Sequence, residues 1–179
     1  MPFKGGTQLW PTVCANLWQR LADEGTIIVP GLLQGDAAQA VLLHVRILAG
    51  RPVAEPLFLE INCTGGDSTC LRIADIIEAY GGDTAAHVVG VAYSAGLILA
   101  IACKRRTAVP NAVFLFHGSP LKDGAADDAQ DAAMFGRRTG RPAEFWAEKA
   151  ENGKEWQVGA EEALELGVIH EITKGGTDG

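Results

Sequence analysis

A serine, a histidine and a pair of glycines each end or follow an apolar run in the middle of the sequence. The glycines are in Ile61-Asn62-Cys63-Thr64-Gly65-Gly66-Asp67, the serine is in Gly90-Val91-Ala92-Tyr93-Ser94-Ala95-Gly96, and the histidine is in Pro110-Asn111-Ala112-Val113-Phe114-Leu115-Phe116-His117. A hydroxyl activated by an imidazole is a nucleophile, and backbone N–H groups beside glycines can stabilise an oxyanion. The three motifs together predict acyl-transfer chemistry of the kind that serine peptidases perform.

Each of these residues also has a plainer role. Ser94 can cap the apolar helix that follows it, and capping serines are common. His117 can be held by a backbone carbonyl at the end of a strand. Gly65-Gly66 can form an ordinary tight turn. The order of the three motifs, and their shared position after strand-like runs, favours the catalytic interpretation over each plainer one.

The elements that must position these residues follow from the apolar patterns. Strand-like runs alternate with helical spacings, which predicts βαβ units, a mainly parallel sheet and an α/β fold. Ligands of such sheets bind at the carboxyl ends of strands, where Gly66, Ser94 and His117 all fall. We expect Pro30-Gly31 to close the first strand, and Asp36 and either Asp67 or Ser68 to cap helices. The predicted strands are 26–29, 57–61, 87–92, 112–116 and 168–172, and the predicted helices are 14–22, 36–48, 67–80, 95–103, 142–151 and 160–166.

Composition limits the class of protein. A chain of 179 residues predicts one domain, 1–179, with disordered ends at 1–6 and 174–179. Apolar residues make up 47% and charged residues 21%, as in folded soluble proteins, and the net charge of −7 argues against nucleic acid or an anionic membrane as a partner. The apolar run Ala95–Cys103 is too short to span a bilayer. With no apolar signal region at the N-terminus, we expect a cytoplasmic protein.

The cysteines predict neither a metal site nor a disulfide. Cys14, Cys63, Cys70 and Cys103 form no C-x-x-C pair, and the histidines are not spaced to complete a zinc site, so we expect no metal or cofactor. Cys63 lies beside the glycines, which makes it an alternative nucleophile, but no basic neighbour in the sequence lowers its pKa. His44 falls within a predicted helix without any surrounding motif, and we interpret it as structural.

The motifs resemble those of ClpP, the proteolytic subunit of the Clp protease, within the wider crotonase-like superfamily. The resemblance extends from about Leu17 to Ile172 and implies stacked βαβ units with a mainly parallel sheet. Besides the three motifs above, it rests on Leu17-Trp18-Gln19-Arg20-Leu21 with Ile27-Ile28-Val29, and on Ala160-Glu161-Glu162-Ala163 with Leu166-Gly167-Val168-Ile169.

The resemblance implies a role for each site residue. Ser94 would be the nucleophile, His117 the general base, and the backbone N–H groups of Gly66 and Ala95 the oxyanion hole. The family carries a third residue, an acid, a few positions before the Ala160 segment, and counting back from Ala160 gives Glu155. Counting forward from Thr139-Gly140 instead ends near Gly153, so a solvated surface carboxylate remains the alternative interpretation of Glu155.

The resemblance also implies partners. These are a homo-oligomeric ring, a peptide or unfolded protein as substrate, and an AAA+ ATPase. The segment between His117 and the final helix is shorter than the family's ring-stacking handle, which favours a single ring or a labile double ring. The N-terminal segment does not obviously match the family's axial loops, and Cys63-Thr64 replaces the family's Ser-Pro.

Three functions therefore compete. The first is a serine endopeptidase that works through a Ser-His-acid site in a ring, and retention of both Ser94 and His117 favours it. The second is a catalytically inactive or dormant ClpP-like assembly subunit. The third is a crotonase-type enzyme acting on acyl-CoA, which needs no Ser–His pair but would need a basic patch for the phosphates, and the sequence has no clear one.

Overall fold

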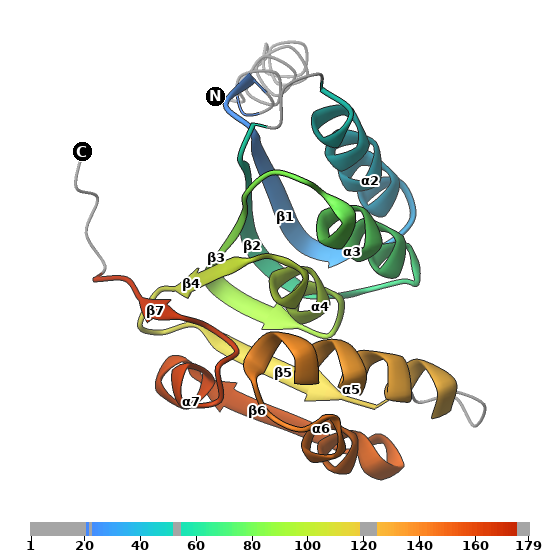
Figure 1. The fold of residues 1–179 in the computed structure, drawn as a ribbon, viewed down its shortest axis with the longest axis vertical. Coiled ribbons are helices and arrows are strands. Elements are labelled where there is room, and N and C mark those ends of the chain that lie inside the picture. Colours follow the sequence, from blue (N-terminus) through green and yellow to red (C-terminus); the bar gives the residue numbers. More distant parts are fainter. Residues whose placement is uncertain (1–20, 22, 52–54, 119–124, 175–179) are drawn as a thin grey trace, which may run out of the picture.

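The computed structural model describes residues 21, 23–51, 55–118 and 125–174 (Figure 1). The predicted helix at 14–22 falls almost entirely outside these residues. So do the predicted disordered segment at 1–6 and all of the one at 174–179 except Lys174. Within the described residues, no helix is long and apolar enough to cross a membrane.

The described residues form one seven-stranded sheet in which a single pair of strands is antiparallel. Its main path runs β1-β2-β3-β4-β7, all parallel, and β5 pairs in parallel with the carboxyl end of β3. β6 then pairs with β5 in the antiparallel sense. This arrangement confirms the predicted α/β fold with a mainly parallel sheet. The strands are β1 (Thr26–Leu33), β2 (Leu57–Gly66), β3 (Thr84–Tyr93), β4 (Arg105–Ala108), β5 (Val113–His117), β6 (Glu155–Gly159) and β7 (Glu171–Ile172).

Helices cover one side of this sheet, and α2 to α5 follow one another along it in Figure 1. Side chains alternate along β2, where Leu59 and Ile61 are buried while Phe58 and Asn62 are exposed, so the buried side chains belong to the helix-covered face. The main core therefore lies between the sheet and these helices. The helices are α2 (Gly35–Ala49), α3 (Thr69–Ala79), α4 (Ala95–Ala102), α5 (Ala125–Thr139), α6 (Ala143–Ala150) and α7 (Ala160–Glu165), with a short 3-10 turn, η1 (Glu151–Gly153).

Two predicted strand ends are wrong. β1 does not close at Pro30-Gly31 but continues to Leu33, with a register shift after Gly31. Proline is tolerated there because β1 is an edge strand, where a missing N–H need not break the ladder. Gly65-Gly66 does not form a tight turn either, because both glycines remain in β2 and pair with the end of β1.

The helix caps also differ in part from the prediction. Asp36 lies inside the first turn of α2 and does not cap it, because Gln34 occupies the N-cap position. Ser68 occupies the N-cap position of α3 and makes no side-chain capping hydrogen bond. The carboxylate of the preceding Asp67 accepts a hydrogen bond from the Thr69 N–H at 2.8 Å and one from the Gly35 N–H at 3.1 Å. One large apolar side chain of α2, that of Ile47, is 66% exposed. The buried side chains are Ala38, Val41, Leu42, Val45 and Leu48.

The sequence did not predict β4 or β6, and it predicted too long a final strand. β4 is short and begins with two arginines, so it lacks an apolar run. β6 alternates exposed residues with the half-buried Trp156 and the buried Val158, in a segment to which the sequence assigned no element. Of the expected strand at 168–172, only Glu171–Ile172 pairs with β4, because the Val168 N–H still bonds the Ala163 carbonyl in the turn that ends α7.

Candidate active site

The carboxyl ends of β2, β3 and β5 meet at one edge of the sheet, on the right in Figure 1. β3 makes this possible because it pairs with β2 on one side and with β5 on the other. Gly66, Ser94, Ala95 and His117 follow or end these strands and line one cavity of about 280 Å³. The structure thus brings together four of the five predicted site residues.

Ser94 forms the turn between β3 and α4 in a strained conformation. Its φ is 50° and its ψ is −113°, and it is the one non-glycine residue with positive φ in the described part of the chain. Its N–H donates to the Leu115 carbonyl at 3.0 Å, and its carbonyl accepts from the Ile98 N–H at 3.0 Å, so β5 and α4 both hold it. A serine on a sharp strand-to-helix turn exposes its hydroxyl beyond the sheet edge.

Glycine is required where β2 passes the serine. Gly65 has φ of 137°, which favours glycine, and a Cβ there would lie 3.9 Å from the Ser94 Cβ. A Cβ on Gly66 would collide with the Leu33 carbonyl oxygen and lie 3.0 Å from the Ala95 Cβ. The main chain of β2 therefore reaches the start of α4 without an intervening side chain.

His117 is half-buried at the end of β5, with one ring nitrogen already engaged. Its Nδ1 lies 2.7 Å from the Gly118 carbonyl oxygen. Because a carbonyl can only accept, this contact requires the proton on Nδ1, which leaves a lone pair on Nε2. That tautomer is the one a general base needs. The sequence had suggested a backbone carbonyl as the plainer role of His117, and here the two roles are compatible.

Glu155 lies opposite His117 on the neighbouring strand. The antiparallel register of β5 and β6 pairs these two residues directly. Such pairs hold their Cβ atoms about 4.5–5.5 Å apart on the same face of the sheet. Glu155 is nevertheless exposed, and within the described residues no hydrogen bond joins it to His117, or His117 to Ser94.

Three carboxylates line the cavity, and the sequence gave none of them a role in a site. Asp67 comes from the β2–α3 connection, whereas Asp128 and Asp131 come from α5. Asp128 and Asp131 are three positions apart and so share one face of the helix. That spacing is visible in the sequence, but only the packing of α5 over the strand ends turns it toward the cavity.

The described cysteines do not offer an alternative nucleophile. Burial raises the pKa of Cys63, and its thiol donates to the Gly65 carbonyl at 3.3 Å. Burial also raises the pKa of Cys70 to about 12, and that of Cys103 to about 12. All three are free thiols, while Cys14 lies outside the described residues. His44 is on α2, away from the cavity lining, and burial lowers its pKa.

Among the described side chains, no group of three or more histidine, cysteine, aspartate or glutamate residues is arranged to hold a metal ion.

The fold and the strand-end cavity define an α/β protein with a mainly parallel sheet and a serine at a strand–helix turn. The sequence model of the Clp protease family matches residues 11–176, and the chain belongs to that family. This confirms the family resemblance seen in the sequence motifs.

Relatives and a solved structure are similar over most of the chain. The ATP-dependent Clp protease proteolytic subunit of Streptococcus sanguinis is 26% identical over 175 residues, covering 88% of both chains. The proteolytic subunit 1 from Gloeobacter violaceus is 27% identical over 188 aligned positions, covering 95% of this chain and 91% of the relative. A crystal structure of a peptidase from Plasmodium falciparum superposes with a TM-score of 0.78 at 19% identity, covering 87% of this chain and 99% of that one. At that identity, the superposition supports the fold alone.

Proposed function

We propose that this chain is a serine endopeptidase that hydrolyses peptide bonds, with Ser94 as nucleophile and His117 as general base. The observation that carries the proposal is the strained turn at Ser94, which opens on a cavity shared with His117. A backbone strain of about 1–3 kcal/mol persists only where the surrounding structure enforces it, and such strain is concentrated at functional sites. Membership of a family whose relatives are named proteolytic subunits supports the same activity.

In this mechanism the lone pair on His117 Nε2 takes the proton of the Ser94 hydroxyl as the oxygen attacks the substrate carbonyl. The protonated imidazole then gives that proton to the leaving amine, which breaks the peptide bond and leaves an acyl ester on Ser94. Water, deprotonated by His117, hydrolyses the ester and regenerates the hydroxyl. The Gly118 carbonyl would hold the ring in the required tautomer throughout.

The backbone N–H groups of Gly66 and Ala95 would stabilise the oxyanion. Successive N–H groups of a strand point to opposite edges, and the Asp67 N–H already bonds the Leu33 carbonyl on the β1 side. The Gly66 N–H therefore points the other way, toward the start of α4. Ala95 is the first residue of that helix, where N–H groups lack intrahelical partners and favour negative charge.

Glu155 is proposed as the acidic partner of His117. Its position opposite His117 in the sheet supports this role. Its exposure and the prior engagement of Nδ1 by Gly118 limit the expected contribution, because the tautomer does not depend on Glu155 alone.

The family also supports assembly and partners. We propose a homo-oligomeric ring in the cytoplasm that takes peptides or unfolded proteins and can work with an AAA+ ATPase. Light scattering at micromolar concentration tests the assembly, and a protein that remains monomeric would contradict it. Because the segment after His117 is short, we expect a single ring or a labile double ring.

A second candidate is a dormant or catalytically inactive assembly subunit. The specific observation in its favour is that, in the described part of the chain, neither Ser94 and His117 nor His117 and Glu155 are joined by a hydrogen bond. Hydrogen bonds of this kind are often long in the absence of substrate, so the observation does not decide between the two candidates.

Labelling with a fluorophosphonate probe decides between them. A peptidase should form a covalent adduct on Ser94, located by mass spectrometry of the digested protein, and should lose it in Ser94→Ala. Ser68→Ala is the matched control, because Ser68 lines the same cavity without the strained turn. An unlabelled but correctly assembled wild-type protein would favour the inactive subunit. Labelling retained in Ser94→Ala would remove Ser94 from the mechanism.

A further inference from the structure

The ladder between β2 and β3 is irregular just before both strands reach the candidate site. The last regular pair is Ile61 with Val88, and the next pair is Cys63 with Ala92. Between these pairs, β2 contributes one residue, Asn62, whereas β3 contributes three. β3 therefore bulges by two residues relative to β2, shortly before Ser94.

On its other edge, β3 changes partner across the same bulge. Residues 85–88 pair with β4, whereas residues 91–93 pair with β5. The contact with β5 continues into the turn, because the Ser94 N–H donates to the Leu115 carbonyl at 3.0 Å. The bulge therefore sets where β3 joins β5, and this junction in turn sets the position of Ser94.

The side chain of Asn62 spans the gap that the bulge leaves in the ladder. Its Oδ1 accepts a hydrogen bond from the Val91 N–H at 3.1 Å. In a regular parallel ladder a main-chain carbonyl of β2 would accept such a bond, but β2 has too few residues here to supply one. Asn62 thus ties β2 to the first residue of β3 that pairs with β5.

Gly90 leaves the space that this contact needs. A Cβ on Gly90 would lie 2.5 Å from the Asn62 Oδ1 and 3.1 Å from its Cγ, and the three atoms nearest to that Cβ all belong to the Asn62 side chain. A larger residue at position 90 would therefore displace the amide of Asn62. The asparagine of one sequence motif and the glycine of the next thus form a single contact.

We propose that Asn62 is a positioning residue for Ser94, and that it acts through the Val91 N–H and the pairing of β3 with β5. Asn62 is exposed and does not line the cavity, so it would affect the reaction only through the main chain of β3. Misplacing a reacting group by about 1 Å can lower a rate about 100-fold, so loss of this contact should be measurable. The inference rests on the proposed peptidase function as far as catalysis is concerned.

The competing explanation is that Asn62 only stabilises the sheet. Thr84 provides a matched comparison, because it makes the same kind of contact at the opposite end of β3, where its Oγ1 accepts a hydrogen bond from the Lys104 N–H at 2.9 Å. Thr84→Val removes this acceptor and keeps nearly the same shape. If a lost sheet contact affects catalysis only through stability, Thr84→Val and Asn62→Ala should behave alike.

The rate at which a fluorophosphonate probe labels Ser94, measured beside kcat and KM for peptide hydrolysis, provides the first test. In Asn62→Ala we expect the labelling rate and kcat to fall about tenfold or more, while KM stays within about threefold of wild type. Asn62→Asp keeps the acceptor oxygen, so both rates should stay within about threefold of wild type, as they should in Thr84→Val. Losses in Asn62→Ala that are matched by either of these variants would overturn the inference.

Gly90→Ala tests the same contact from the other strand. The new Cβ displaces the Asn62 amide, so the losses should be similar to those of Asn62→Ala. The double variant should lose no more than either single variant, because each change removes the same hydrogen bond. Additive losses would mean that the two positions act separately, and would overturn the inference.

Hydrogen–deuterium exchange at the Ser94 N–H provides a test that needs no catalysis. This N–H should exchange about tenfold faster or more in Asn62→Ala than in wild type, and at the wild-type rate in Thr84→Val, because only the first change loosens the pairing of β3 with β5. If the wild type is neither labelled nor active but shows this pattern, the peptidase function fails while the positioning of Ser94 by Asn62 stands. Unchanged exchange at Ser94 in Asn62→Ala would overturn the inference, whatever the activity.

Discussion

The two sides of the candidate site are built in opposite ways. Where β2 meets the start of α4, the chain uses glycine, alanine and serine, and main-chain atoms approach one another directly. On the other side, behind His117, the block formed by α5, α6 and β6 is packed with aromatic rings. Phe116 precedes His117 and lies 4.8 Å from Phe135 and 5.6 Å from Trp146 between ring centroids.

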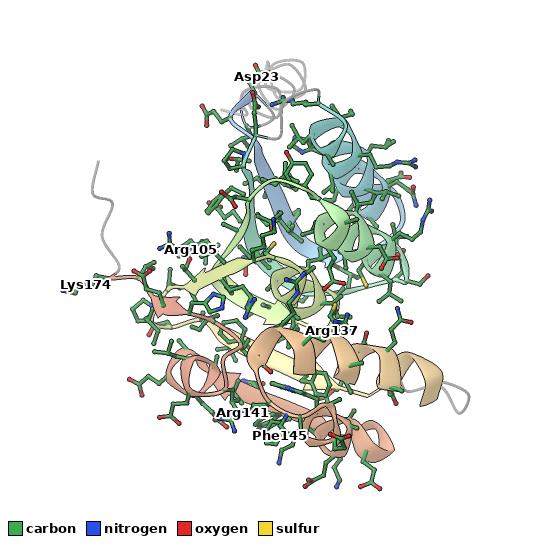
Figure 2. The ribbon with its side chains drawn as sticks, in the orientation of Figure 1. Asp23, Arg105, Arg137, Arg141, Phe145 and Lys174 are labelled. Atoms are coloured by element: carbon green, nitrogen blue, oxygen red, sulfur yellow. The ribbon has the colours of Figure 1, made fainter. Side chains whose placement is uncertain are left out.

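The aromatic block extends to the surface, where cations cover it. Figure 2 labels Arg141 and Phe145 in this part of the molecule, and the Arg141 guanidinium carbon lies 5.3 Å from the Phe145 ring centroid. The Lys149 ammonium lies 5.1 Å from the Trp156 ring centroid. Such contacts stabilise by about 0.5–1 kcal/mol each at exposed sites. Ser94, the proposed nucleophile, is thus positioned by backbone conformation, whereas His117, the proposed base, is positioned by side-chain packing.

A buried arginine on β4 connects this block to the rest of the sheet. Arg106 on β4 is 2% exposed. Its guanidinium donates to the carbonyls of Val168 at 2.7 Å, Cys103 at 2.9 Å and Arg138 at 2.7 Å. Burial lowers its pKa to about 10, which still leaves it charged at neutral pH. Carbonyl dipoles therefore tie β4 to the ends of α5 and α7.

The largest effect on stability should come from the aromatic block. Trp146→Ala removes a side chain that is 1% exposed and contacts several rings, and it should lower the free energy of unfolding by about 3–5 kcal/mol. Urea unfolding followed by circular dichroism measures this. Trp156→Ala is the control, because Trp156 is only half-buried and its loss should lower the free energy of unfolding clearly less. Equal losses would mean that packing behind His117 is not centred on Trp146.

The largest effect on catalysis after Ser94 itself should come from the glycine side. Gly66→Ala forces the main chain away from Leu33 and Ala95. If the Gly66 N–H is an oxyanion donor, as proposed, its displacement should lower kcat by about 100- to 1000-fold. Peptide hydrolysis by the purified variant measures this, with Gly81→Ala as control because a Cβ there meets nothing within 4 Å. Activity of Gly66→Ala within threefold of wild type would mean that the carboxyl end of β2 does not contribute to catalysis.

Glu155→Gln should have a smaller effect. Because the Gly118 carbonyl already holds His117 Nδ1, we expect kcat to fall about tenfold rather than the ~10⁴-fold seen when a buried triad acid is lost. Steady-state kinetics beside Glu148→Gln, an exposed carboxylate on α6, give the comparison. If the two variants behave alike, Glu155 is a surface carboxylate.

The smallest effect concerns pH. Burial, followed by the charges of Arg106 and Arg105, lowers the pKa of His170 in the folded protein. The unfolded chain therefore binds a proton more readily, so this contribution to stability is present above the unfolded pKa of about 6.5 and decreases as the pH falls below it. Thermal unfolding between about pH 8 and pH 5.5 should show a smaller loss in His170→Gln than in wild type, and identical losses would contradict the prediction.

The difference between the backbone-built side and the aromatic side of the candidate site also explains which features could be predicted from the sequence. Gly66, Ser94 and His117 were predicted at strand ends because each motif combines an apolar run with a small or polar residue, and both signals are local. β6 and the carboxylates on α5 were missed because their roles depend on segments packed far from them in the sequence. Glu155 was placed by counting from Ala160, and only the β5–β6 register showed that it faces His117.

The burial of the Arg106 charge could not be predicted from either kind of local signal. Arg106 lies in a short strand that begins Arg105-Arg106, and nothing nearby distinguishes the exposed arginine from the buried one. The carbonyls that receive its guanidinium come from around α4, α5 and α7. Burial of this kind follows from the tertiary fold, since charged residues are otherwise expected outside.

The turn at Ser94 sets stability against activity. A residue with a Cβ at a φ of 50° and a ψ of −113° lowers the free energy of unfolding by about 1–3 kcal/mol. This is a substantial share of the free energy of unfolding of a typical domain, which is about 5–15 kcal/mol. Glycine would adopt this conformation without that strain, so we expect Ser94→Gly to fold more stably while lacking the proposed nucleophile. Selection for thermal stability alone would therefore favour replacing the serine. Its presence here means that the rest of the fold is stable enough to compensate for the strain at that one position.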